Sequence, residues 1–142
     1  MILISHRGNI NGKDVENENN PVYIDKALED GFDVEIDVWY KDGIWYLGHD
    51  EPIYPINLEY LKNKKFWCHS KNIDALNLML ENDIHCFWHQ DDDVTITSCG
   101  FMWTSPDTKL TEKSICVLPE INNQSITKCA GICSDYITNY RN

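Results

Sequence analysis

The stretch DVEIDVWYKDGIWYLGHD, residues 33–50, decides the fold of this chain. Its first six residues alternate acids with β-branched residues, and a repeat of two is typical of a β-strand. The β-branched face suits packing under helices, and the opposite face carries Glu35 and Asp37. Acids on one face of a buried strand are costly unless a cation or strong hydrogen bonds meet them. The stretch therefore predicts a buried strand whose acidic face has such a partner.

A hairpin follows this strand. The pair Asp42-Gly43 stands between apolar residues and is the strongest short-range signal for a hairpin turn. If these two residues form the turn, Val38 pairs with Leu47. The same register returns His49 to the neighbourhood of the two acids. A histidine beside two carboxylates is the first indication of a catalytic site.

Length and charge limit the classes of protein to consider. With 142 residues, 42% of them apolar, the chain is most simply one domain over residues 1–142. The formal net charge of -11 argues against nucleic acid as a partner. It also means that an anionic substrate needs local help from arginine, histidine or a metal. No apolar run approaches the roughly 20 residues of a membrane span, so we expect no transmembrane segment.

The cysteines and the first residues bear on the compartment. Six cysteines raise the question of a disulfide framework. Cys68, Cys86 and Cys116 each stand inside an apolar run, where free cysteine behaves as a small buried hydrophobe. The apolar start MILIS is too short for a signal peptide. We therefore expect reduced thiols and a cytoplasmic protein.

The order of elements favours an α/β architecture. About seven strands alternate in part with helices, which are expected to begin at Asn20-Pro21, at Asn57 and near Ile73. Nearly every strand ends at polar or charged residues, as in a closed β/α barrel, although such barrels typically run about 250 residues. We therefore predict a compact or incomplete TIM-type (β/α) barrel with reduced helices. An open α/β sheet is the alternative.

Several motifs together resemble the glycerophosphodiester phosphodiesterase family over about the first fifty residues. They are His6-Arg7-Gly8, Glu18-Asn19, Gly31, Glu35-x-Asp37, Asp42-Gly43 and His49-Asp50, and the late segment GICSD at residues 131–135 resembles the closing strand of that family. The resemblance implies a TIM-type barrel and metal-dependent hydrolysis of phosphodiesters. The layout is also similar to phosphatidylinositol-specific phospholipases and sphingomyelinase D-like enzymes. The substrate is therefore left open between small-molecule and lipid-head-group phosphodiesters.

Four residues suit the binding of a metal and a phosphate. Glu35 and Asp37, two apart on one strand face, can share one hard cation, Mg²⁺ or Ca²⁺ before Mn²⁺. Arg7 offers a planar fork that matches phosphate oxygens. Lys71 is placed to add positive charge over the site.

The proton transfers are expected from two histidines. By resemblance, one of His6 and His49 takes a proton from the nucleophile and the other protonates the leaving oxygen. Which residue does which is left open. Glu18 and Asp50 are expected to support them, Glu18 through hydrogen bonds and Asp50 as a turn residue or a partner of the site.

His69 is where the sequence departs from the family. The resembling enzymes place an acid, as the third metal ligand, two residues before a lysine, and here His69 stands two residues before Lys71. An imidazole ligand should weaken Mg²⁺ or Ca²⁺ and favour Mn²⁺ or Zn²⁺, which accept nitrogen readily. The alternative is that water fills this position.

Two function classes follow. The first is a phosphoric diester hydrolase, with Trp103 and Glu120 as candidates for a leaving-group pocket. The second is a catalytically silent barrel domain that binds a cation or a phosphorylated ligand. The presence of both histidines, the arginine and both carboxylates favours the enzyme.

Overall fold

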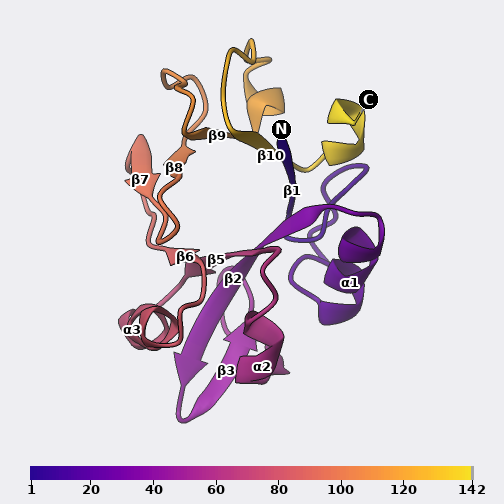
Figure 1. The fold of residues 1–142 in the computed structure, drawn as a ribbon. Coiled ribbons are helices and arrows are strands. Elements are labelled where there is room, and N and C mark those ends of the chain that lie inside the picture. The colour runs from indigo at the N-terminus through magenta and orange to yellow at the C-terminus, as the bar shows by residue number, and fades with distance from the viewer. Residues whose placement is uncertain (142) are drawn as a thin grey trace.

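One ten-stranded β-sheet, curled round on itself, forms the frame of the protein (Figure 1). The computed structural model describes residues 1–141. The strands are β1 (Ile2–His6), β2 (Asp33–Lys41), β3 (Ile44–Leu47), β4 (Tyr54–Ile56), β5 (Phe66–Ser70), β6 (Cys86–Phe87), β7 (Val94–Ile96), β8 (Met102–Thr104), β9 (Ser114–Val117) and β10 (Gly131–Ser134). The helices are α1 (Pro21–Glu29), α2 (Leu58–Leu61) and α3 (Ile73–Glu81), with 3₁₀ turns η1 (Pro119–Ile121) and η2 (Ile137–Tyr140).

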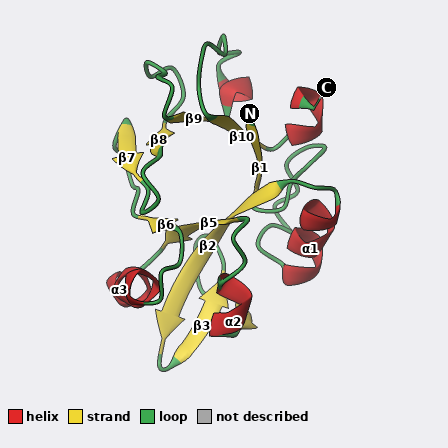
Figure 2. Cartoon of the chain, viewed as in Figure 1, coloured by secondary structure: helices red, strands yellow, loops and turns green. Residues whose placement is uncertain are grey.

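The predicted TIM-type (β/α) barrel is wrong. Within residues 1–141 the chain forms only three short α-helices, and none of them follows β6, so the regular strand–helix alternation of such a barrel is missing. In that same part of the chain β6 and β7 are not paired, so the sheet stays open, and the β2–β3, β3–β4 and β7–β8 pairs are antiparallel. The α-helices flank only the part of the curl that contains β1, β2, β5 and β6 (Figure 2). The connections from β7 to β10 are loops rich in Ser, Thr and Asn, which lack the apolar repeat that a covering helix needs.

The acidic strand behaves as its alternation predicts. Val34, Ile36 and Val38 of β2 are fully buried in a cluster with residues of α1 and α3. Glu35 and Asp37 point to the opposite face, since side chains alternate along a strand. The hairpin register is also confirmed, with Val38 opposite Leu47 and Tyr40 opposite Trp45.

The predicted helix starts are confirmed by their caps. The side chain of Asn20 accepts a hydrogen bond from the backbone N–H of Val22, two residues into α1. Asn57 caps α2 in the same way, and Asn72 caps α3. An Asn at this position satisfies backbone donors that the helix leaves unpaired. These short helices thus start where local chemistry directs them.

Aromatic side chains fill the inside of the curl. Trp67 of β5, Phe87 of β6 and Trp103 of β8 belong to one buried cluster. The ring centroids of Phe87 and Trp103 are 4.6 Å apart and those of Trp67 and Trp103 are 5.9 Å apart. Because these strands lie in different parts of the curl, the contacts between their aromatic side chains hold the curl in shape.

Asp33 stands at the first position of β2, before Glu35 and Asp37. It accepts a hydrogen bond from the Trp67 indole, so the role of Asp33 is structural.

Two further observations concern the whole described chain. All six cysteines are unpaired in the part of the chain that the structure describes. Among residues 1–141 there is also no helix with the length and apolar character that crossing a membrane requires.

The packing of His85 inside the curl predicts how the stability of the protein depends on pH. Its ring packs on Trp67, with centroids 4.3 Å apart, and its Nε2 lies 2.7 Å from the Thr97 hydroxyl. Burial lowers the pKa of His85 to about 4. The unfolded chain therefore binds a proton that the folded chain excludes, and stability should be lost as the pH falls from about 6.5 toward 4. His85→Gln should remove this part of the loss, which urea denaturation at pH 7.5 and pH 5 would measure. An equal loss of stability in both proteins would contradict the assignment.

Candidate active site

Parallel strand ends bring the site together. In the register of β1 and β2, His6 lies beside Glu35, and in that of β2 and β5, Asp37 lies beside His69. On the other side of β1, β10 ends one residue before Asp135. Carboxyl ends of parallel strands meet at one edge, so these five side chains share one end of the curl.

Glu35, Asp37 and His69 form a cluster that suits a metal ion. One ligand atom from each lies within 4.8 Å of the others. Nδ1 of His69 is 3.3 Å from Asp37 Oδ1 and 3.8 Å from Glu35 Oε2. Glu35 and Asp37 are 2% and 0% exposed, yet Glu35 Oε1 and Asp37 Oδ1 have no hydrogen-bond partner. Because buried unpartnered carboxylate oxygens are costly, this geometry fits a bound cation.

The hydrogen-bond partner of His69 also fits a bound cation. Its Nε2 lies 2.8 Å from the backbone carbonyl oxygen of His89. A carbonyl oxygen only accepts, so Nε2 carries the hydrogen and Nδ1 of the neutral ring presents a lone pair to the carboxylates. Metal-bound histidines typically have their second ring N–H held in this way. The three residues thus offer a cation one nitrogen and two carboxylates.

The pKa values of the two acids are shifted in opposite directions. Burial and the nearby Asp37 charge raise the pKa of Glu35 well above its usual range. Burial also acts to raise the pKa of Asp37, but the close His49 and His69 rings and the charge of Arg7 outweigh it and hold the value well below the usual range. Asp37 is therefore the more acidic member of the pair.

Arg7 links the acids to the second histidine. It follows β1 in a left-handed conformation, with a φ of 59°. Its Nη1 donates to Glu18 Oε1 at 3.1 Å, its Nε lies 3.1 Å from Asp37 Oδ2, and its Nη2 lies 3.5 Å from His49 Nε2. Burial acts to lower the pKa of Arg7, but the charges of Asp37, Glu35 and Glu18 outweigh it, so the pKa is raised. The guanidinium is thus a fixed positive charge, oriented by the two carboxylates that it contacts.

His6 is oriented by Asp135. Its Nδ1 lies 2.7 Å from Asp135 Oδ1, while its Nε2 is 3.8 Å from Glu35 Oε1. Burial acts to raise the pKa of Asp135, but the His6 hydrogen bond, the charges of His6 and Arg7 and a bond from Asn9 lower it. Since the ionised carboxylate only accepts, Nδ1 of His6 carries the hydrogen and Nε2 of the neutral ring has a free lone pair. His6 is thereby arranged to accept a proton.

His49 occupies a more open position. The β2–β3 hairpin brings it back to Asp37, with Nδ1 3.7 Å from Asp37 Oδ2, as its register predicts. Its Nε2 lies 3.6 Å from Asp50 Oδ1, and its side chain is 41% exposed. His49 can therefore exchange protons with solvent, and Asp37, Asp50 and the Arg7 guanidinium lie near its ring.

Sequence reasoning missed three supporting residues. Asn9 donates to Glu18 Oε2 and to Asp135 Oδ1, both at 2.8 Å. Asn19 donates to Asp37 Oδ2 and accepts from the Asp37 backbone N–H, both at 2.9 Å. The polar loop after β1 gives no pattern that distinguishes Asn9, whereas Asn19 stands in the Glu18-Asn19 motif and Asp135 ends the GICSD segment.

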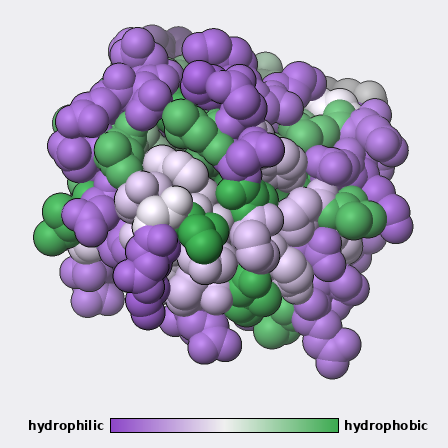
Figure 3. All heavy atoms as spheres, turned by 90° about the horizontal axis from the view of Figure 1, so that it is seen from below, coloured by the Kyte–Doolittle hydropathy of each residue, from purple (hydrophilic) through white to green (hydrophobic). Residues whose placement is uncertain are grey.

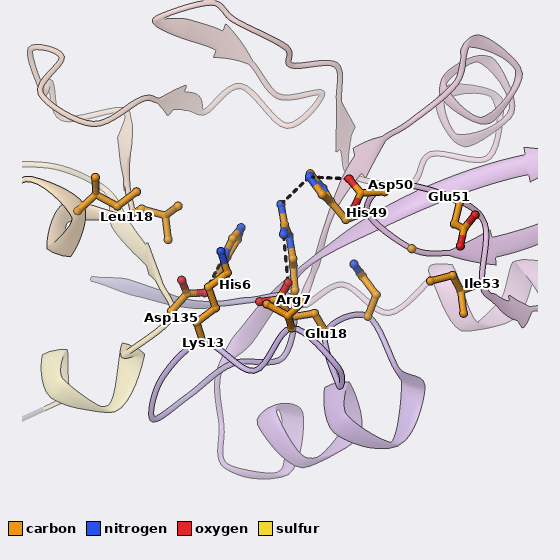
Figure 4. Close-up of a pocket in the computed structure, with 14 residues that line it drawn as sticks. His6, Arg7, Lys13, Glu18, His49, Asp50, Glu51, Ile53, Leu118 and Asp135 are labelled. Carbon is orange, nitrogen blue, oxygen red and sulfur yellow. Dashed lines mark hydrogen bonds and ion pairs between the residues drawn. The ribbon is translucent and has the colours of Figure 1, made fainter.

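A cavity of about 660 Å³ opens beside these groups. His6, Arg7, Glu18, His49 and Asp135 line it, and Figure 4 shows Arg7 between the two histidine rings. The cluster of Glu35, Asp37 and His69 is not part of the lining. Its two carboxylates lie 3.1 to 3.8 Å from His6, Arg7 and His49, which line the cavity.

Three other predicted site residues take different places. Lys71 follows β5, and its charge opposes the burial that raises the pKa of Glu35. Trp103 is buried against Phe87 and does not line the cavity. Glu120 accepts hydrogen bonds from the Ser134 hydroxyl and from the Asp135 backbone N–H, so it anchors the end of β10. Neither Trp103 nor Glu120 is positioned to form a leaving-group pocket there.

No family model, no curated protein and no solved structure matches this chain. A function can therefore be inferred only from the arrangement of side chains at the end of β1, β2, β5 and β10.

Proposed function

We propose that the protein is a phosphoric diester hydrolase that depends on a divalent cation and uses His6 and His49 for proton transfer. One observation carries the proposal: the guanidinium of Arg7 joins the buried carboxylate cluster to His49, at a cavity that His6 also lines. A planar cation at this place suits the non-bridging oxygens of a phosphodiester. Displacement at phosphorus needs such charge neutralisation together with a base and an acid.

Glu35, Asp37 and His69 would hold the cation. When bound there, it supplies positive charge that offsets the charge on a phosphate oxygen. The buried carboxylate oxygens without partners and the Nδ1 lone pair of His69 support this assignment. Arg7 orients the diester next to the cluster.

The geometry supports His6 as the base. Its Nε2 takes the proton from the attacking water as the new bond between oxygen and phosphorus forms. Asp135 keeps the Nδ1–H bond and stabilises the imidazolium that results. The burial of this pair keeps the ring in one orientation.

His49 then serves as the acid. In its charged form it gives a proton to the leaving oxygen as the bond from that oxygen to phosphorus breaks. Asp37 and Asp50 lie near its ring, 3.7 Å from Nδ1 and 3.6 Å from Nε2. Exposure lets His49 regain its proton from solvent after each turnover.

Chelation followed by cation addition tests the proposal. Chelator-treated protein should cleave neither glycerophosphocholine nor bis(p-nitrophenyl) phosphate, and Mg²⁺, Ca²⁺ or Mn²⁺ should restore cleavage. Glu35→Gln should abolish both this recovery and cation binding measured by calorimetry. Asp33→Asn is the matched control, because Asp33 lies on the same strand but bonds to Trp67 at its other end. Full activity in the chelator would refute the mechanism, whereas cation binding without any turnover would favour a binding domain.

A further inference from the structure

Apolar side chains surround the mouth of the catalytic cavity. Val15, Ile53 and Ile121 are 69%, 51% and 61% exposed, and all three line the same cavity as the two histidines. Leu118, which is partly buried, joins them. We refer to these four residues as the apolar rim.

The apolar rim is assembled by the tertiary fold. Val15 lies between β1 and α1, Ile53 between β3 and β4, and Leu118 and Ile121 at η1. Figure 4 shows Leu118 on one side of His6 and Arg7 and Ile53 on the other. Backbone hydrogen bonds hold both sides in place. The Ile53 N–H donates to the carbonyl of Leu47 at 3.0 Å, and the Leu118 N–H donates to the carbonyl of Cys133 at 2.7 Å.

The other exposed aliphatic residues among residues 1–141 lie outside this cavity; Met1 lines a smaller one, beside Asp33 and Arg141. Figure 3 shows the face that carries α2, α3 and the hairpin, where hydrophobic residues lie in small separate groups among hydrophilic ones. Single exposed aliphatic residues are normal, whereas apolar side chains that rim a site with convergent polar groups are typical of ligand binding. The rim therefore needs a ligand with an apolar part.

We propose that the substrate is an amphiphile, a phosphodiester that carries an alkyl chain, with its phosphate at Arg7 and its chain against the apolar rim. This inference rests on the hydrolase proposed above and names its substrate class. The cavity of about 660 Å³ is of the size that holds one small molecule. The rim encloses a concave site, and Asp50 and Glu51 line the cavity with it, so a single amphiphile fits better than an anionic lipid surface.

A chain-length series measures the contribution of the rim. The probes are glycerophosphocholine, which has no chain, and alkylphosphocholines with progressively longer chains, each below its critical micelle concentration. Calorimetry in a chelator measures binding without the proposed hydrolysis. Each added methylene that the rim buries should tighten binding by up to about fourfold, the ratio that corresponds to about 0.8 kcal/mol.

Two double variants make the comparison specific. Ile53→Ser with Ile121→Ser should flatten the dependence on chain length. Ile73→Ser with Ile96→Ser is the control, because both residues are strongly exposed but lie outside the cavity, and it should keep the wild-type dependence. Circular dichroism checks that both proteins are folded.

The outcomes separate this inference from the hydrolase itself. Chain-dependent binding that is lost in the rim variant supports the inference even if no diester is cleaved. Turnover with binding and kcat/KM independent of chain length overturns it while the hydrolase stands. Sedimentation with phosphatidylcholine vesicles, without chain dependence below the micelle concentration, also overturns it, since the rim would then be a membrane contact.

Discussion

His6→Ala and His49→Ala are each expected to lower diester cleavage by about 10²-fold or more, because positioned acids and bases contribute factors of this size. The loss should fall on kcat, since Arg7 and the cation held by Glu35, Asp37 and His69 would still bind the phosphate. Neither histidine belongs to the buried apolar clusters, so the variants should stay folded. The measurement is steady-state kinetics with the restored cation.

The pH profile distinguishes the roles of the two histidines. The base must be deprotonated, so the wild-type rate should fall at low pH and the His6 variant should lose this dependence. The acid must be protonated, so the rate should fall at high pH and the His49 variant should lose that limb instead. His85→Gln is the matched histidine control, because His85 bonds to Thr97 away from the cavity. Undiminished cleavage in either alanine variant would refute the assignment.

His69→Glu is expected to tighten Mg²⁺ binding relative to Mn²⁺. The substitution replaces a nitrogen ligand with a carboxylate beside Glu35 and Asp37, and Mg²⁺ prefers oxygen whereas Mn²⁺ accepts nitrogen. A shift in the ratio of the dissociation constants of about tenfold is the size that changes around metal ligands produce. Calorimetric titration of chelator-treated protein with each cation measures this ratio, independently of turnover.

Two comparisons show whether His69 touches the metal. His69→Gln removes the Nδ1 lone pair without adding charge, so it should weaken Mn²⁺ more than Mg²⁺. Thermal unfolding of His69→Glu at saturating cation measures whether the protein tolerates the added carboxylate once the metal is bound. If the preference stays as in the wild type, water rather than His69 fills the position.

Local patterns in the sequence were enough to predict the acidic strand, its hairpin and the helix caps. Alternation, the Asp42-Gly43 turn and the capping Asn20 act over a few residues, so their consequences can be worked out without the fold. His49 was placed near Glu35 and Asp37 for this reason. The resemblance pointed to the same histidines and acids, and their catalytic roles stay predictions.

The arrangement of the strands in space could not be predicted from these local patterns. Strand ends with polar residues are shared by any parallel arrangement, so they did not distinguish a β/α barrel from a curled sheet. What closes or opens the sheet is the packing of Trp67, Phe87 and Trp103 inside the curl and the absence of covering helices over β7 to β9 among residues 1–141. These are contacts between strands far apart in the chain.

The sequence by itself determined which strand carries the acids, which face they occupy and how the hairpin returns His49. Only the tertiary structure decided the partners that give these groups their chemistry. Asp135 meets His6 across 129 positions of the chain, and the carbonyl of His89 sets which nitrogen of His69 faces the acids. The reason is physical: a periodic pattern selects the face of a strand, whereas a hydrogen bond between distant segments depends on how the whole sheet curls.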